Sequence, residues 1–402
     1  MNRLSCKRTI AAVTSTRAEY GLLRGLLQKI QASPALELRL VVTGAHLCGR
    51  LGRTVAEIEA DGLPIAARLP ILDETCPDEP VARTIARTIA VFDDEFAAHR
   101  PDAVLLLGDR FEIFAVAVAA AARHIPIAHI SGGDVTLGAA DESYRHCITK
   151  MAAVHFPSCA DSAARLLRMG EAPDTVFCVG GLGDENIRTL PKMSREELCR
   201  STGFDLMQPF GLVTYHPETA CDAGDPAAQA DALCRAMTAV PGVFWLITGS
   251  NADAGGAVCT AKMQDFAAAH PDRAGFINSL GLRRYLSAMN YAAVVAGNSS
   301  SGVVETPTFG VPAVNIGSRQ AGRTLCANVI CCEASAPAIE AALRRALTPR
   351  FRQIARTAQS PYNGGDTSAK ICAVLRSFDF SAPKSFYDGP VPHFDPERNI
   401  DL

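Results

Sequence analysis

The chain lacks a stretch of apolar residues long enough to cross a lipid bilayer, which takes about 20 residues in a helix. The N-terminal segment Met1–Lys7 is short and polar, and it lacks the apolar stretch of a signal peptide. The run Ala115–Ala122 is apolar but short and rich in alanine, which is typical of a buried helix. We therefore expect a cytoplasmic protein that does not engage membranes.

Neither sign of charge dominates the composition. The 39 lysines and arginines are balanced by 42 aspartates and glutamates, which leaves a net charge of −3. This balance excludes a general electrostatic attraction to nucleic acids or to anionic membranes. An anionic ligand must therefore be held by local groups.

The 14 cysteines show none of the spacings that indicate cysteine chemistry. There is no Cys-x-x-Cys pair, and no group of Cys and His residues has the spacing of a zinc site. Only Cys331 and Cys332 are adjacent. We expect reduced thiols that pack as small apolar side chains, without a disulfide framework or a bound metal.

Two common nucleotide-binding signatures are also missing. The segment Thr14–Gly21, between the first predicted strand and helix, has no GxGxxG pattern and no Gly-Lys-Ser/Thr ending. This argues against a dinucleotide-binding turn and against a Walker loop. We expect no NAD and no other cofactor.

The length of 402 residues is enough for two domains. Along the chain, short apolar runs alternate with helical patterns. Such alternation predicts parallel sheets with right-handed crossovers. The fold class expected is α/β, with two Rossmann-like domains facing across a cleft, as in glycosyltransferase-B-like proteins. The flexible Gly180–Gly183 segment marks the boundary, which predicts domains at 1–182 and 183–375 and a C-terminal tail at 376–402.

The predicted strands are 9–13, 36–43, 103–107, 127–130, 154–156, 210–215, 243–248, 274–277, 292–296 and 313–316, with a further apolar unit at 176–179. The predicted helices are 22–30, 54–61, 81–100, 111–124, 142–151, 162–169, 227–240 and 338–347.

Polar clusters follow the predicted strands, where ligands of parallel sheets bind. The first is Thr14–Gly21, in which the N–H groups of a helix start and Arg17 favour a phosphate. The alternative is that Thr16 caps the helix and Arg17 is a solvated surface residue. The segment by itself does not separate the two.

Acidic residues follow the next strands of the first domain. Asp109 comes after the strand 103–107, and Asp134 follows the strand 127–130 and a pair of glycines. Asp141 and Arg145 are four residues apart and share a helix face. These are candidates for acid–base catalysis. The alternatives are a helix-capping role for Asp109 and a surface ion pair for Asp141 with Arg145.

The second domain carries hydroxyl groups and a histidine after its strands. His216 follows the strand 210–215 and can donate to a phosphate or act as a general acid. Ser299, Ser300, Ser301 and Gly302 form a phosphate cradle at a helix start, and Glu305 could accept hydrogen bonds from ribose hydroxyls. The alternatives are a structural histidine and a serine-rich helix cap. Arg319 lies in a further polar loop after a strand.

In this order, the clusters resemble the hydrolysing UDP-N-acetylglucosamine 2-epimerases of sialic-acid and legionaminic-acid biosynthesis. The strings that carry the resemblance are TSTRAEYG (14–21), GDRFEIFAVA (108–117), GGDVTLGAADESYRH (132–146), YHPET (215–219), GSNADAGG (249–256), GNSSSGVVETP (297–307) and NIGSRQAGR (315–323). They span nearly the whole chain, and the tail 385–388 is similar as well.

The resemblance implies which residues act. The UDP-binding residues it implies are Arg17, Arg110, His216, Asn251, Ser299, Ser300, Glu305 and Arg319, to which Ser301 and Gly302 of the cradle are added. The catalytic residues expected are Asp109, Asp134, Asp141, Arg145 and His216. Many relatives carry Glu where this chain has Ser131, so the acid–base group remains open and Asp134 is the nearest acid.

The resemblance also implies the reaction. A UDP-linked N-acetyl amino sugar loses UDP by elimination to a glycal, and hydration then yields the free 2-epimer. The first candidate substrate is UDP-N-acetylglucosamine, which gives N-acetylmannosamine, and the alternative is UDP-2,4-diacetamido-2,4,6-trideoxyglucose. A non-hydrolysing epimerase, a glycosyltransferase of the same fold and a UDP-sugar sensor are the other readings. A homodimer or homotetramer is implied.

Overall fold

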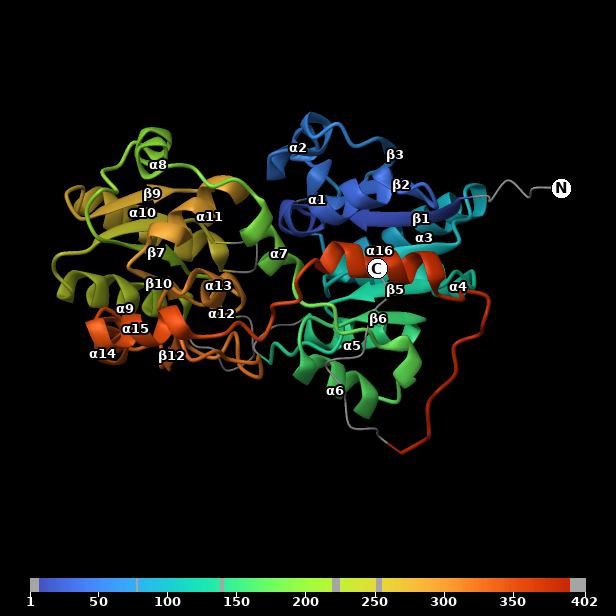
Figure 1. Cartoon of the computed structure of the whole chain (residues 1–402). Helices are drawn as coiled ribbons and strands as arrows, with labels where there is room; N and C mark the ends of the chain where they lie inside the picture. Colours follow the sequence, from blue (N-terminus) through green and yellow to red (C-terminus); the bar gives the residue numbers. More distant parts are fainter. Residues whose placement is uncertain (1–6, 77–78, 138–140, 219–224, 251–254, 391–402) are drawn as a thin grey trace. The chain divides into compact units, whose positions relative to one another are not determined.

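The computed structural model describes residues 7–76, 79–137, 141–218, 225–250 and 255–390. They divide into two compact units. Unit 1 contains residues up to 134 together with 141–185 and 364–390, and unit 2 contains 135–137 and 186–363. Each unit is an α/β structure around one sheet of six parallel strands (Figure 1).

Unit 1 has the strand order β3-β2-β1-β4-β5-β6. Its strands are β1 (Arg8–Thr14), β2 (Leu36–Thr43), β3 (Ile65–Leu69), β4 (Ala103–Leu107), β5 (Ile127–Ile130) and β6 (Val154–Phe156). Its helices are α1 (Arg17–Ala32), α2 (Val55–Ala60), α3 (Val81–Ala98), α4 (Phe111–Ala122), α5 (Glu142–Met151), α6 (Ala160–Arg168) and α16 (Thr367–Ser377).

Unit 2 repeats this strand order, as β12-β11-β10-β7-β8-β9. Its strands are β7 (Phe210–Thr214), β8 (Phe244–Thr248), β9 (Ala274–Ile277), β10 (Val294–Gly297), β11 (Ala313–Ile316) and β12 (Val329–Cys332). Its helices are α8 (Arg195–Thr202), α9 (Pro226–Ala239), α10 (Gly256–Ala269), α11 (Gly281–Tyr291), α12 (Ser301–Val304), α13 (Thr306–Phe309), α14 (Ala336–Ala346) and α15 (Pro349–Thr357). The helix α7 (Leu182–Thr189) spans the boundary between the units.

Both faces of each sheet are buried, which explains the continuous apolar runs of the strands. On β1, Ile10 and Ala12 contribute to one core cluster, whereas Ala11 and Val13 contribute to the cluster on the opposite face. The helix α1 buries a stripe of leucines and Ile30 at helical spacing against the first of these clusters. Each such side chain contributes roughly 1.5–3 kcal/mol when fully buried.

The strand order reverses between β1 and β4 in unit 1 and between β10 and β7 in unit 2. At such a point the connections leave the two neighbouring strands in opposite directions, which opens a space at their carboxyl ends. The predicted clusters at 14–21, 108–117, 215–219 and 297–307 directly follow these four strands. The topology therefore places them at the switch points.

The helix α16 belongs to unit 1, whereas the predicted division placed residues up to 375 in the second domain. It packs against α1, and Ile371, Val374 and Leu375 join the core of unit 1. Figure 1 shows α16 beside the unit 1 sheet. The apolar face of α16 is buried by residues that lie far away in sequence, which periodicity does not reveal. The other boundary, at residue 185, is three residues from the predicted one.

Several strands and one helix have the predicted bounds, namely β2, β4, β5, β6, β9, β11 and α5. The outer strands β3 and β12 were not predicted. On β3 the side chains alternate between half-buried and exposed, so the apolar signal is weak at this edge. The apolar unit at 176–179 is no strand, since only Val176 pairs there, as an isolated bridge with His155.

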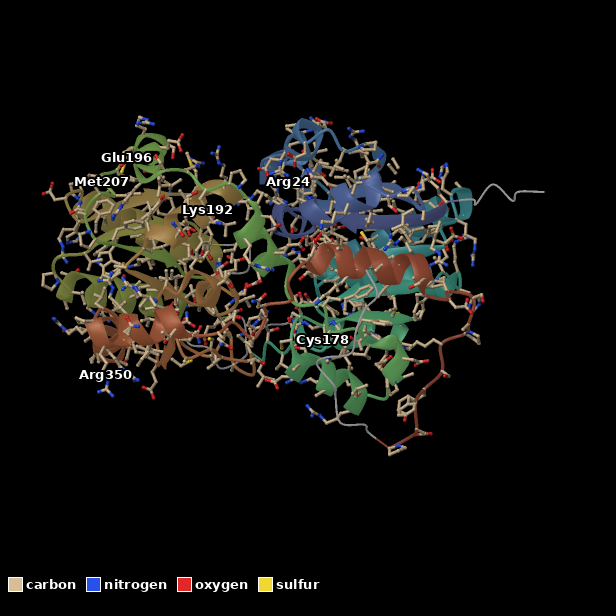
Figure 2. All side chains as sticks on the ribbon, in the orientation of Figure 1. Arg24, Cys178, Lys192, Glu196, Met207 and Arg350 are labelled. Carbon is tan, nitrogen blue, oxygen red and sulfur yellow. The ribbon has the colours of Figure 1, made fainter. Side chains whose placement is uncertain are left out.

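The cysteines within the described ranges are free thiols. Cys178, labelled in Figure 2, is one of them, and burial raises the pKa of its thiol to about 12. A thiol held in the protonated form is a poor nucleophile. In the described ranges, no helix is both long and apolar enough to span a membrane.

Candidate active site

The turn that follows β4 is braced by a buried histidine. Gly108 has a φ of 83°, a left-handed conformation that suits glycine. His129 on β5 donates Nε2–H to the carbonyl of Gly108 at 2.8 Å, and its Nδ1 lies 3.3 Å from Thr149 Oγ1. Burial lowers the pKa of His129 to about 3, so the ring stays neutral. The brace fixes the direction in which Asp109 leaves the strand.

Arg145 joins two of the predicted catalytic positions. Its guanidinium forms an ion pair with Asp109, donates to the backbone carbonyl of Asp134 at 2.9 Å and donates to Glu142 Oε2 at 2.8 Å. The Arg145 side chain is 3% exposed, and those of Asp109 and Glu142 are 22% and 20% exposed. A buried guanidinium thus holds two carboxylates that remain partly accessible.

Glu142 also contacts the histidine one turn further along α5. His146 Nε2 lies 3.0 Å from Glu142 Oε1. Since a carboxylate only accepts hydrogen bonds, this nitrogen carries the proton. Asp109, Arg145, Glu142 and His146 therefore form one hydrogen-bonded chain, which we call the Asp109–His146 chain.

The carboxylate of Asp134 is directed elsewhere. Its Oδ1 accepts hydrogen bonds from Ser158 Oγ at 2.9 Å and from Ser162 Oγ at 2.6 Å, and the residue is 9% exposed. These contacts tie the loop after β5 to the start of α6. The geometry therefore favours a structural role for the Asp134 carboxylate, while its backbone carbonyl supports Arg145.

The positions on either side of this loop have different environments. Ser131 has a φ of 63° and donates its N–H to the carbonyl of Phe156. Asp141 immediately precedes α5, and its backbone carbonyl accepts the N–H of Arg145 at 3.1 Å. Asp141 therefore lies one helical turn from Arg145, at the end of α5 nearest the strand ends.

The start of α1 is occupied by a carboxylate of its own. Glu19 accepts hydrogen bonds from Ser15 N at 2.7 Å and from Ser15 Oγ at 3.0 Å, while Thr16 Oγ1 caps the N–H of Glu19. The capping role of Thr16 is thus present. The N–H of Ser15, which the phosphate reading would have left open, is engaged by Glu19.

Arg110 is paired with carboxylates of unit 1, whereas Arg17 is exposed to solvent. Arg110 lies 3.1 Å from the carboxylate of Glu112 and 4.0 Å from that of Glu19. Burial opposes the charge of Arg110, but Glu112, Glu19 and Asp141 outweigh this effect and raise its pKa. Arg17, the first residue of α1, is exposed. Arg17 is therefore the freer cation for an anionic ligand in unit 1.

Glu19 leads to a prediction about pH and stability. Burial raises the pKa of Glu19 from 4.5 to about 7. The folded chain then binds this proton more tightly than the unfolded chain, so the stability it confers is complete below pH 4.5 and is lost as the pH rises through 7. Glu19→Gln cannot titrate, and its free energy of unfolding relative to wild type should rise by about 2–3 kcal/mol between pH 5 and pH 8.

Urea unfolding at the two pH values measures this difference. Glu37→Gln, an exposed glutamate on β2, is the control. A difference for Glu19→Gln that stays constant with pH contradicts the prediction.

In unit 2, His216 and Asn298 connect the ends of β7 and β10. The N–H of His216 donates to Asn298 Oδ1, and Asn298 Nδ2 donates to the carbonyl of His216, both at 2.8 Å. The close approach depends on Gly297, whose φ is 134° and whose added Cβ would overlap the carbonyl oxygen of Thr214. Asn298 therefore holds the two predicted motifs in register.

The His216 ring is buried and neutral. It is 5% exposed, and its Nδ1 lies 3.2 Å from Ser250 Oγ. Burial, with a smaller effect of Arg319, lowers its pKa to about 3. A neutral imidazole can donate to a phosphate oxygen but is a weak general acid at neutral pH. Of the two roles predicted for His216, the geometry favours phosphate binding.

The serine cradle leads into two short helices instead of one long helix. Ser299 and Ser300 accept the N–H groups of Gly302 at 3.1 Å and Val303 at 3.0 Å through their carbonyls. The chain then forms α12, with Glu305 between α12 and α13. Burial raises the pKa of Glu305 to about 7. With this pKa, the Glu305 carboxyl group can be protonated or ionised near neutral pH, and in either state it can accept hydrogen bonds from hydroxyl groups.

The loop that carries Arg319 is tied to the His216 segment. Glu218 accepts hydrogen bonds from Ser318 N at 2.7 Å and Ser318 Oγ at 2.8 Å. Arg319 Nη1 and Gln320 Nε2 both reach the carbonyl of Asn298, at 3.4 Å and 2.9 Å. The structure thus brings His216, Asn298 and Arg319 together.

Several residues of these networks were not among the candidates from the sequence, including Glu142, His146, Asn298 and Glu218. Each lies inside a quoted motif, so its position was visible, but nothing local indicated its partner. Asn251, predicted to bind UDP, lies outside the described residues. Within those residues, no group of three or more His, Cys, Asp or Glu side chains could hold a metal ion.

Two doubly wound units, each with polar groups at its switch point, define an α/β enzyme of two Rossmann-like domains with a glycosyltransferase-B-like fold. Among solved structures, the chain is similar to the UDP-GlcNAc 2-epimerase from Neisseria meningitidis bound to UDP-GlcNAc, at 16% identity and a TM-score of 0.79, over 91% of this chain and 99% of that one. A 2-epimerase structure from Listeria monocytogenes has 18% identity and a TM-score of 0.79, over 95% and 99%.

Comparison of sequences is more specific. The profile of the UDP-N-acetylglucosamine 2-epimerase family matches residues 28–376. The polysialic acid biosynthesis protein P7 of Escherichia coli is 34% identical over 95% of this chain and 98% of the relative. The GDP/UDP-N,N'-diacetylbacillosamine 2-epimerase (hydrolyzing) of Campylobacter jejuni is 36% identical, over 81% and 84%. The chain belongs to the UDP-N-acetylglucosamine 2-epimerase family and is a UDP-sugar 2-epimerase of the hydrolysing kind, which confirms the resemblance seen in the motifs.

Proposed function

We propose that this enzyme converts UDP-N-acetylglucosamine to N-acetylmannosamine and UDP, as a step in the formation of sialic or related nonulosonic acids. The observation that carries the proposal is the pairing of Asp109 with Arg145 at one switch point and of His216 with Asn298 and Arg319 at the other, in a chain of this family. Relatives at 34% identity and above act on nucleotide sugars or serve polysialic acid synthesis by their names.

The chemistry follows from the substrate. The C2 proton of the sugar has no adjacent carbonyl and is not acidic, so a base removes it while the C1–oxygen bond breaks. The electron pair of that bond leaves with UDP, and a C1=C2 double bond remains in the glycal. Water then adds its oxygen to C1 and loses a proton to a base, while C2 receives a proton on the opposite face.

The two sets of residues suit the two needs of this reaction. Arg17, His216, Arg319 and the serines 299–301 stabilise the departing diphosphate, since donors aimed at developing negative charge lower the barrier. Asp109 and Asp141 supply the carboxylates for proton transfer. In this proposal neither NAD nor a metal takes part.

A second candidate substrate is favoured by a specific observation. Two relatives, from Campylobacter jejuni and Legionella pneumophila, at 36% and 34% identity, are named as hydrolysing 2-epimerases of N,N'-diacetylbacillosamine linked to UDP. The same residues would perform the same steps on this 2,4-diacetamido-2,4,6-trideoxy sugar. The two substrates differ only at C4 and C6.

The deciding experiment supplies each UDP-sugar separately to the purified protein, without added NAD or metal, and identifies the products by NMR. Free UDP with N-acetylmannosamine supports the first candidate, and turnover of the diacetamido sugar alone supports the second. In heavy water the product must carry deuterium at C2. Retention of UDP on the product would indicate a non-hydrolysing epimerase, unchanged C2 a glycosyltransferase, and binding without turnover a sensor.

Binding of UDP provides a further prediction. His216→Ala and Ser299→Ala should each raise the Kd of UDP by about 5–20-fold, because each loses a hydrogen bond to a charged phosphate. Isothermal titration calorimetry measures the change. His270→Ala, whose ring contacts the carbonyl of Phe266 near the end of α10, is the control in the same unit. Unchanged Kd values for both site variants would remove these residues from the diphosphate site.

A further inference from the structure

The Asp109–His146 chain contains one more carboxylate than the sequence motifs assign. The charge of Arg145 is permanent at physiological pH, and its guanidinium is buried between Asp109 and Glu142. Two negative groups therefore share one positive charge. Asp109 comes from the end of β4 and Glu142 from the first turn of α5, so the sharing depends on the tertiary structure.

The sharing has a consequence for Asp109 as a base. A carboxylate beside an uncompensated guanidinium is a weak base, since the opposite charge favours its ionised form. Removal of a proton from C2 needs a stronger base than that. Glu142, on another nitrogen of the same guanidinium, offsets the charge that Asp109 experiences and leaves Asp109 more basic.

His146 determines where the Glu142 carboxylate lies. Its Nε2–H holds Oε1 of Glu142 at 3.0 Å, which leaves Oε2 facing Arg145 at 2.8 Å. Charged and titratable groups near this chain include Asp141 at the start of α5, Arg110 after β4 and the neutral His129 on β5. His155 and Lys384 lie close enough to His129 to lower its pKa. The carboxylate of Asp134 is engaged by Ser158 and Ser162.

We infer that Glu142 and His146 are positioning residues that set the base strength of Asp109 through Arg145. They need not touch the sugar. The inference rests on the proposed function for its catalytic meaning, but the change in Asp109 can be measured without turnover. The inference can therefore be tested separately from the proposed function.

The direct measurement follows the carboxyl carbon of Asp109 by NMR in protein labelled at aspartate, with the signal assigned by its loss in Asp109→Asn. Glu142→Gln keeps the size of the side chain and removes its charge. The titration midpoint of Asp109 should then fall by about one pH unit. Glu142→Asp, which restores the charge, should return part of this shift, and His146→Gln should show a smaller shift than Glu142→Gln.

A matched control exists on α3. Glu95 accepts from Arg39 Nε at 3.0 Å and lies 3.6 Å from the ring of His99, four residues further on, so it has the same kinds of partner. Glu95→Gln should leave the Asp109 titration unchanged. An unchanged titration in Glu142→Gln overturns the inference, whatever the enzyme turns over.

Kinetics then connects the shift to the reaction. In Glu142→Gln, kcat should fall at least about tenfold, KM should stay within about threefold, and the acid limb of the kcat/KM profile should move to lower pH with the Asp109 midpoint. Loss of kcat with the acid limb in place is what a merely structural role gives, and it overturns the inference. If wild type releases neither UDP nor a free 2-epimer from either sugar, the proposed function fails, while the NMR result still decides the inference.

Discussion

Asp109→Asn is expected to lower kcat by about 1,000-fold or more, while the Kd of UDP changes by less than about threefold. Asparagine has the size of aspartate, and its amide oxygen can still accept a hydrogen bond from Arg145, but it cannot accept a proton. The contacts expected to bind the diphosphate lie mainly in unit 2, at His216 and the serines after β10, so UDP affinity should be kept. The measurement is kcat by NMR or coupled UDP release, with UDP binding by calorimetry.

Asp102→Asn is the matched control for this variant. Asp102 directly precedes β4, at the end of the strand opposite Asp109, and its Oδ2 accepts the N–H of Thr9 at 2.8 Å. Its substitution should leave kcat within about twofold. Turnover of Asp109→Asn close to that of wild type would show that another group removes the C2 proton.

The second large effect is expected from Gly297→Ala. The added Cβ would lie well inside 3.0 Å of the carbonyl oxygen of Thr214, a backbone atom of the neighbouring strand that cannot move without breaking the ladder between β7 and β10. We expect a loss of at least about 3 kcal/mol in the free energy of unfolding. Because Asn298 follows directly and ties the two strand ends together, UDP binding should be lost as well.

Gly242→Ala separates the clash from the conformational cost of losing a glycine. Gly242 has a φ of 75°, but a Cβ there would meet nothing within 4 Å. Its substitution should cost only about 1–2 kcal/mol, the cost of a left-handed conformation in an alanine. Equal losses for the two variants in urea unfolding would contradict the steric argument at Gly297.

Much of the fold could be predicted from the sequence because buried parallel strands are continuous apolar runs. The strands β4, β5 and β6 and the helix α5 have the bounds that the pattern indicated. The edge strand β3 was missed, since its side chains alternate between half-buried and exposed and none is fully buried. The residues of α16 up to 375 were expected in the second domain but lie in unit 1. The partner helix α1 is about 350 residues away in sequence, a distance that no local pattern spans.

The candidate site could be predicted only as a set of motifs. Asp109 and His216 follow strands, so the rule for parallel sheets indicated them, and Arg145 was indicated by its spacing of four residues from Asp141. Glu142 is one residue from the predicted Asp141, and only the structure shows that it contacts Arg145. Asp134, the nearest acid to Ser131, turned out to have its carboxylate engaged by Ser158 and Ser162. The occupation of the Ser15 N–H by Glu19 was equally invisible to motif analysis.

The sequence by itself determined the alternation of strands and helices, the order of the polar motifs and membership of the family, because each of these depends on patterns among residues that are close in sequence. The tertiary structure alone decided which charges face one another. Parallel pairing brings the carboxyl ends of β4 and β5, and the helix α5 that follows, to one edge of the sheet. Side chains more than 30 residues apart in sequence, such as Asp109 and Arg145, meet there and acquire their chemistry from each other.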